Sequence, residues 1–169
     1  SQLVWQNQED KFLQSIEQDH EGNLWVPTEM YPYQVDKKYV GSDWGTYKDG
    51  AITKVSADGE ILFQKSVSNI FIENNLELLL FPITGGNFQS DPIHLNDIQP
   101  VLTDGPYWKR GDVFLSLRNQ SMIVLYRPSS NKIIWKGLEH TAAQHDVDIL
   151  DNHRISFFNN NVKHFFDGN

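Results

Sequence analysis

Residues 111–135 read GDVFLSLRNQSMIVLYRPSSNKIIW, and this stretch decides the fold class. It holds two short runs of apolar, β-branched and aromatic residues, at 113–119 and 122–128, and the start of a third at 132–138, which are separated by turn residues. Such runs predict antiparallel strands joined by tight turns. A further run at 94–102 (HLNDIQPVL) precedes them, so the sequence predicts one unit of four antiparallel strands.

The same plan recurs on both sides of this unit. Upstream, AITKVS (51–56) and EILFQKSV (60–67) flank a turn and resemble residues 122–138. A second correspondence pairs residues 16–26 with 147–157, because in both an alternating strand runs into a turn rich in Asp, Asn, Gly and His and then into a second strand. Repetition of one small unit is typical of folds in which each unit buries its faces only against its neighbours.

We therefore predict an all-β fold, a β-propeller of four-stranded antiparallel blades that is present here in part, as about two to three blades. The expected division is a partial blade over about 1–90, a complete blade over about 91–139 and the start of a further blade over about 140–169. Complete propellers have about four to eight blades, so the remainder would come from the same chain or from another chain. A β-sandwich is the alternative that the pattern leaves open.

The remaining segments are less regular. Residues 28–49 and 82–92 predict loops, as does the turn-rich insertion at 103–112. Residues 68–80 fit either a short helix or a strand, and residues 162–166 fit a last strand. The chain opens with SQLVWQNQED, which is neither a start methionine nor a signal peptide, and we expect a processed or truncated end.

Composition limits what the chain binds. Hydrophobic residues make up 39% and charged residues 21% of its 169 residues, which is ordinary for a globular domain. The formal net charge of −8 disfavours nucleic acid, which requires a basic face. The absence of cysteine excludes disulfides, zinc–thiolate sites and thiol chemistry. No apolar run reaches the length of about 18 residues that a membrane span requires, so none is expected in this chain.

Candidate site residues gather where strands begin and end. His94 and His145 stand at the starts of the first strands of successive units, and first strands line the channel of a propeller. Two imidazoles brought together suit nucleophilic or acid–base work, because their pKa lies near neutral pH. Asn96 is expected on the same side as His94, and Arg118 can hold two oxygens of a sulfate. Each candidate also has a structural alternative: the two histidines would cap strands, Asn96 would be an amide at a strand edge, and Arg118 would form an exposed ion pair.

Two neighbours of His145 complete the set of candidates. Gln144 precedes it directly, and His140 lies close enough in sequence to reach the same channel mouth, so both are candidate substrate contacts. Neither a metal nor a cofactor is predicted. The two strand-start histidines with Asp91 or Asp97 lack a diagnostic metal spacing, and no glycine-rich phosphate loop follows a strand and opens a helix.

Taken together, these motifs resemble the bacterial arylsulfotransferase (ASST) family. Residues 91–101 (DPIHLNDIQPV), 111–135 and 144–161 (QHDVDILDNHRISFFNNN) carry counterparts of its His-x-Asn, Ser-x-Arg, Ile-x-Trp, Gln-His-Asp and Phe-Asp-Asn steps. The close resemblance covers roughly residues 91–161. It implies a six-bladed propeller that moves a sulfuryl group from a phenolic sulfate to another phenol without a nucleotide donor, through a transiently sulfated histidine.

The resemblance also implies roles for individual residues. His145 would be the nucleophile, and His94, Asn96 and Arg118 would hold the sulfate oxygens. The ligand would be a small aryl sulfate or phenol, and the location would be periplasmic or secreted.

Two departures from the family pattern leave other functions open. Active members carry another channel histidine on an earlier blade, and the internal repeat places Gln14 there. The Phe-Asp-Asn step reads Phe158-Asn159-Asn160, which lacks the carboxylate. A propeller that binds an anion or small aromatic without turnover, and an interaction scaffold, are therefore the alternatives to an enzyme.

Overall fold

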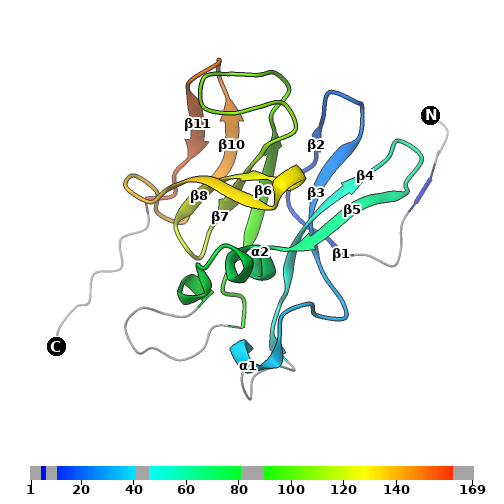
Figure 1. The fold of residues 1–169 in the computed structure, drawn as a ribbon, viewed down its shortest axis with the longest axis vertical. Helices are drawn as coiled ribbons and strands as arrows, with labels where there is room; N and C mark the ends of the chain where they lie inside the picture. Colours follow the sequence, from blue (N-terminus) through cyan, green and yellow to red (C-terminus); the bar gives the residue numbers. More distant parts are fainter. Residues whose placement is uncertain (1–4, 7–10, 41–45, 81–89, 162–169) are drawn as a thin grey trace.

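The computed structural model describes residues 5–6, 11–40, 46–80 and 90–161, and their regular structure is mainly antiparallel β-sheet (Figure 1). Within these residues three sheets follow one another along the chain. The predicted all-β class is confirmed. No helix in this part of the chain is long and apolar enough to cross a membrane.

The first sheet has four strand positions, although its first strand is interrupted. Two short strands pair with the same edge of β3, and β4 and β5 follow on its other edge. The sequence predicted two hairpins in this region, 12–18 with 24–27 and 51–56 with 60–67, and only a partial blade; the structure joins these hairpins in one sheet. The strands are β1 (Lys11–Phe12), β2 (Glu17–Gln18), β3 (Leu24–Glu29), β4 (Gly50–Val55) and β5 (Ile61–Ser66).

The second sheet contains four strands that pair in chain order, as the sequence predicted. The predicted turn-rich insertion lies between its first two strands. The third sheet is a hairpin of two strands in the described residues. The strands are β6 (Leu95–Pro100), β7 (Val113–Leu117), β8 (Met122–Arg127), β9 (Lys132–Gly137), β10 (His145–Ile149) and β11 (Ile155–Phe158).

Short helices connect the sheets. The segment 68–80, which fitted a helix or a strand, is helical, and the hydroxyl of Ser66 caps it by accepting a bond from the Asn69 N–H. The helices are α1 (Lys37–Val40), α2 (Val67–Glu73) and the 3₁₀ turns η2 (Glu77–Leu80) and η3 (Pro128–Ser130). Much of the predicted loop at 82–92 and the predicted strand at 162–166 lie outside the described residues.

The strands β6, β7 and β8 of the second sheet are buried on both faces, which explains the nearly continuous apolar runs of β7 and β8, whereas β9 is largely exposed. Neighbouring residues of a strand point to opposite faces, so alternate side chains enter different cores. Toward the first sheet and α2 the two central strands contribute Val113, Leu115, Leu117, Met122, Val124 and Tyr126. Toward the third sheet they contribute Phe114, Ile123 and Leu125, which pack against Val147 of β10 and Trp108 of the insertion.

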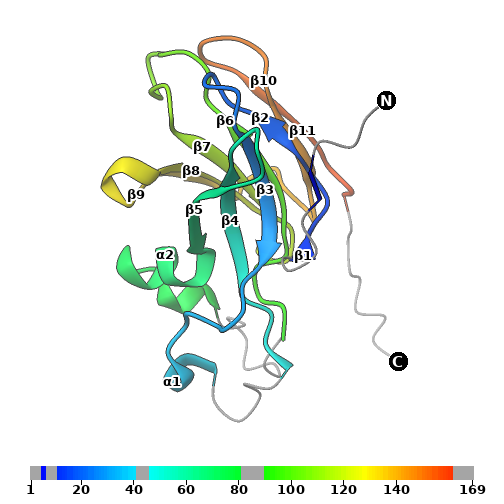
Figure 2. The ribbon, with the colours of Figure 1, turned by 90° about the vertical axis from the view of Figure 1, so that its right-hand side faces the viewer.

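The three sheets are stacked with the second sheet in the middle (Figure 1). Its first strand, β6, contacts both β3 and β10. Figure 2 shows the strands of each four-position sheet running from a first strand on one side of the molecule to β5 or β9 on the other. A middle layer that is buried on both faces distinguishes this arrangement from a two-layered sandwich.

Candidate functional site

The first strand of each sheet is irregular at one place, and the candidate residues lie at these places. In the first sheet, the four residues 13–16 between β1 and β2 lie opposite only two residues of β3, 26–27, so two residues are extra to the ladder. Asn96 bulges from β6, and Asp146 bulges from β10. A bulge changes the direction of nearby side chains, and bulges are frequent beside active sites. His145 directly precedes one of these irregularities, and His94 lies two residues before another.

The two histidines are not at equivalent positions relative to the bulges. His94 lies two residues before its bulge at Asn96, whereas His145 lies directly before its bulge at Asp146. Counted in this way, Gln144 corresponds to His94, so the equivalence expected from the repeat is wrong by one residue. The reason is that a bulge shifts the strand register without a signal in the apolar pattern.

His94 is held by Asp91, three residues earlier. One carboxylate oxygen of Asp91 accepts a bond from the His94 backbone N–H at 3.0 Å, and the other lies 2.8 Å from the ring Nδ1. Burial opposes the charge of this carboxyl, but the bonds from His94 and the nearby Lys48 ammonium lower its pKa overall. A charged carboxylate only accepts hydrogen bonds, so Nδ1 of His94 carries a proton and Nε2 is free for other partners.

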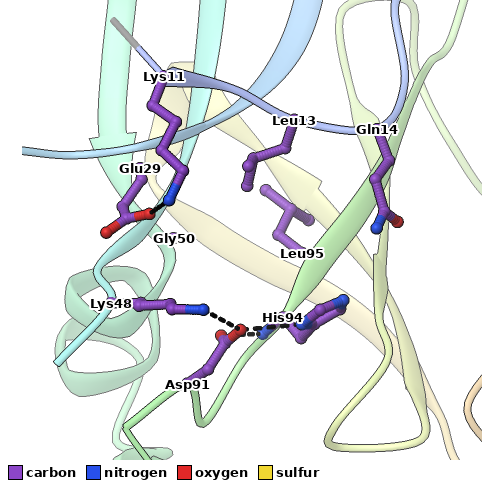
Figure 3. A pocket seen from close by; sticks show the side chains of 9 residues that line it. All are labelled: Lys11, Leu13, Gln14, Glu29, Lys48, Gly50, Asp91, His94 and Leu95. Carbon is purple, nitrogen blue, oxygen red and sulfur yellow. Dashed lines mark hydrogen bonds and ion pairs between the residues drawn. The ribbon is translucent and has the colours of Figure 1, made fainter. Parts of the chain in front are cut away.

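His94 and Asp91 line a cavity between the first and second sheets (Figure 3). The cavity has a volume of about 90 Å³, which is room for several water molecules. Gln14 lines the same cavity, where the resemblance predicts a histidine in active members. The other walls combine cationic, anionic and apolar groups: Lys11, Leu13, Glu29, Lys48, Gly50 and Leu95.

His145 lies near the other charged candidates. Burial lowers the pKa of its ring, and the charges of Arg118 and His94 lower it further. The Arg118 N–H donates to the His94 carbonyl at 3.1 Å, and β10, which begins at His145, contacts β6, so the three residues lie in adjoining segments. Nδ1 of His145 is 3.2 Å from the amide nitrogen of Asn160. The guanidinium of Arg118 is half-buried and donates to the Asn119 side chain at 3.0 Å.

Asn96 and Gln144 join the second and third sheets and do not face an open pocket. The Asn96 amide donates to the Gln144 carbonyl at 2.8 Å, and the Gln144 amide donates to the Met122 carbonyl at 2.8 Å. Both side chains are buried. The expected alternation from His94 to Asn96 fails because His94 has a φ of 47° and Asn96 is the bulged residue. Asp97, considered as a metal ligand, is also buried and accepts from the Val147 N–H at 2.8 Å.

His140 is exposed and does not line the cavity of His94. Among the described residues, no group of three or more His, Asp or Glu side chains is arranged to hold a metal ion. Asp91 was considered from the sequence only as a metal ligand, and its bonds to the backbone and ring of His94 were not expected. An Asp followed by Pro favours a turn in which its side chain bonds the backbone ahead, and that signal was present in the sequence.

Comparison with known proteins extends the resemblance to nearly the whole chain. A family model described as Arylsulfotransferase (ASST) matches residues 2–169. No curated protein and no solved structure matches the chain.

Proposed function

Since the chain belongs to the arylsulfotransferase (ASST) family, we propose that it transfers a sulfuryl group from a phenolic sulfate ester to a phenol, through a sulfo-histidine intermediate and without a nucleotide donor. The observation that carries this proposal is that His94, Arg118 and His145 lie in adjoining segments, at or beside the ends of β6, β7 and β10. Two imidazoles and a guanidinium offer a nucleophile, a proton carrier and an anion-holding group.

His145 is the proposed nucleophile, as the resemblance implies. Its lowered pKa keeps the ring neutral near neutral pH, so a nitrogen lone pair is available to attack sulfur. Arg118 holds the sulfate oxygens and stabilises the charge on the transferring group. Asn96 and Gln144 support this site from behind by joining the sheets that carry the two histidines.

A propeller is the architecture that we propose for the whole fold. Stacked sheets with adjacent first strands, and a middle sheet buried on both faces, support blades arranged around an axis. The proposed blades span about residues 1–90, 91–139 and 140–169. Further strands, from the same chain or from another chain, would complete the ring. A periplasmic or secreted location belongs to the same proposal.

Release of p-nitrophenol from its sulfate ester tests the activity. The purified protein should release p-nitrophenol when phenol is supplied. His145→Ala should abolish this release and should also abolish the increase in protein mass that sulfation causes. His20→Gln is the control, because His20 is exposed in a hairpin turn. Turnover that survives in His145→Ala would reject the assignment of the nucleophile.

Binding of an anion without turnover is the second candidate function. It is favoured by Gln14, which stands in the cavity where active members are expected to carry a histidine. Calorimetry with an aryl sulfate should then give binding that weakens in Arg118→Ala, with no phenol released. Measurable turnover by the wild-type protein would remove this candidate.

A further inference from the structure

We propose that His94 is the general acid–base residue of the transfer and that Asp91 is the carboxylate that positions it; this inference rests on the proposed function. The sequence resemblance assigns His94 only to holding sulfate oxygens and assigns Asp91 no role. The geometry at the start of β6 supports proton transfer by His94 and positioning of its ring by Asp91.

The first observation is the direction of the hydrogen bonds. Asp91 accepts from the ring Nδ1 of His94 at 2.8 Å, so the neutral ring keeps its proton on Nδ1 and presents a lone pair at Nε2. A ring in this state takes a proton at Nε2 or, once protonated, gives one there. Nε2 can donate a hydrogen bond to a sulfate oxygen only when the ring is protonated, and a protonated ring is also the form that acts as a general acid.

The second observation is that the backbone around this pair is fixed at several points. His94 has a φ of 47°, which is unfavourable for a non-glycine residue, so its surroundings must impose it. The turn between β7 and β8 supplies the restraints. The Arg118 N–H donates to the His94 carbonyl at 3.1 Å, the Asn119 amide donates to the Asp91 carbonyl at 2.6 Å, and the Gln120 amide donates to the Pro92 carbonyl at 2.7 Å.

The third observation is the access that the cavity gives. His94 is half-buried with 32% of its side chain exposed, and Asp91 is 22% exposed. Figure 3 shows the ring in the cavity wall with Asp91 on its Nδ1 side. A substrate oxygen can therefore approach the ring without disturbing the carboxylate. Partial burial also strengthens the bond between the two groups relative to a fully exposed pair.

The chemical steps balance with His94 in this role. In the first step, a nitrogen of His145 forms a bond to sulfur while the bond from sulfur to the phenolic oxygen breaks, and its electron pair stays on that oxygen. Protonated His94 gives its Nε2 proton to the oxygen, so a neutral phenol leaves. In the second step, the acceptor oxygen attacks sulfur, the bond to His145 breaks, and neutral His94 takes the hydroxyl proton of the acceptor. The Nδ1 proton stays with Asp91 throughout.

Two donors that differ only in their leaving group test this role. Phenyl sulfate has a basic leaving group that needs a proton, whereas p-nitrophenyl sulfate has a good leaving group that departs without one. With a naphthol as common acceptor, His94→Gln and Asp91→Asn should lower kcat/KM of the donor, which reports only the first transfer step, about 100-fold for phenyl sulfate and no more than about fivefold for p-nitrophenyl sulfate. Asp151→Asn is the matched control, because it removes the carboxylate of an exposed Asp–His pair, and both rates should stay within about twofold of wild type.

Nitrogen NMR of the wild-type protein adds a measurement that does not depend on variants folding. The neutral His94 ring should carry its proton on Nδ1, where the Asp91 carboxylate accepts it. A proton on Nε2, or an equal loss of rate with both donors, would overturn the inference while the proposed function stands. Absence of phenol release from either donor by the wild-type protein would instead reject the proposed function.

Discussion

Asp91 with His94 and Asp151 with His153 form the same kind of pair in two different places. Both carboxylates lie close to a histidine Nδ1, at 2.8 Å in the first pair and 3.1 Å in the second. Their surroundings differ. The first pair lines a cavity and is tied to a neighbouring turn, whereas the second sits in the exposed turn between β10 and β11. Its histidine side chain is 54% exposed.

The groups that lower the pKa of the two carboxylates also differ. The bond from the Arg154 guanidinium is the main cause that lowers the pKa of Asp151 to about 2, so His153 is a minor partner there. For Asp91, burial opposes ionisation and His94 supplies the main compensation. The comparison teaches that an Asp–His bond marks a reactive histidine only where the histidine is the principal partner of the carboxylate and faces a space that a substrate can enter.

Chemical rescue should show the largest difference between the pairs. Asp91→Ala removes the carboxylate beside the cavity, and we expect a loss of about 100-fold in kcat for phenyl sulfate. Added acetate should restore about tenfold, because the cavity adjoins the vacated position and a small carboxylate can bond His94 there. Asp151→Ala should show neither loss nor rescue. Equal acetate effects on both variants would show that the cavity has no special role.

The pH dependence of the unfolding free energy should next show whether the charge of Asp91 stabilises the fold. The folded-state pKa of Asp91 lies below its ordinary value of 3.8, so its stabilisation is present above that value and is lost as the pH falls through the lower folded value. Asp91→Asn should therefore cost about 1–2 kcal/mol of unfolding free energy at pH 7 and progressively less in the acid range. Urea unfolding across pH measures this gap. A constant gap would mean that the charge of Asp91 is not involved.

The strands of the fold could be predicted from the sequence because alternation and turn residues are local signals. β7, β8 and β9 follow apolar runs that turns interrupt, and the structure places them as expected. The hairpin of residues 12–18 with 24–27 was also predicted, and β2 pairs with β3 there, but the interruption that divides its first strand into β1 and β2 was not, because it depends on the pairing with β3. Segment 68–80 was ambiguous because its apolar spacing fits either element, and packing of Ile70 and Phe71 into the core favours the helix.

The positions of the candidate residues along the strands could be predicted, but the directions of the amide side chains could not. His94, Arg118 and His145 were expected at strand ends, and they lie at or beside the ends of β6, β7 and β10. Asn96 was expected to face a ligand by simple alternation, and the bulge turned it into the seam between sheets instead. A bulge depends on hydrogen bonds between strands, so one strand's sequence does not reveal it.

The loop restraint should matter less than the carboxylate itself. Asn119→Ala removes the 2.6 Å bond to the Asp91 carbonyl, which loosens the backbone that carries the pair, and it also removes the 3.0 Å bond that the Arg118 guanidinium donates to the Asn119 side chain. We expect about tenfold lower kcat with phenyl sulfate, with the fold retained, because misplacement of a catalytic group is costly. Asn152→Ala is the matched control, since the Asn152 side chain lies 2.7 Å from the Nδ1 of His153 in the exposed pair. Similar losses in both variants would point to a general effect on stability.

Lys48 should contribute least, and it separates two explanations of how Asp91 acts. Its ammonium lies 3.9 Å from the Asp91 carboxylate, but the side chain is 51% exposed, so salt screens the interaction. If Asp91 acts through its bond to His94, Lys48→Gln should change kcat by no more than about twofold, and added salt should reduce even that. A loss as large as that of Asp91→Asn would mean that the lysine charge acts on the substrate directly. Steady-state rates with phenyl sulfate at low and high salt decide between these explanations.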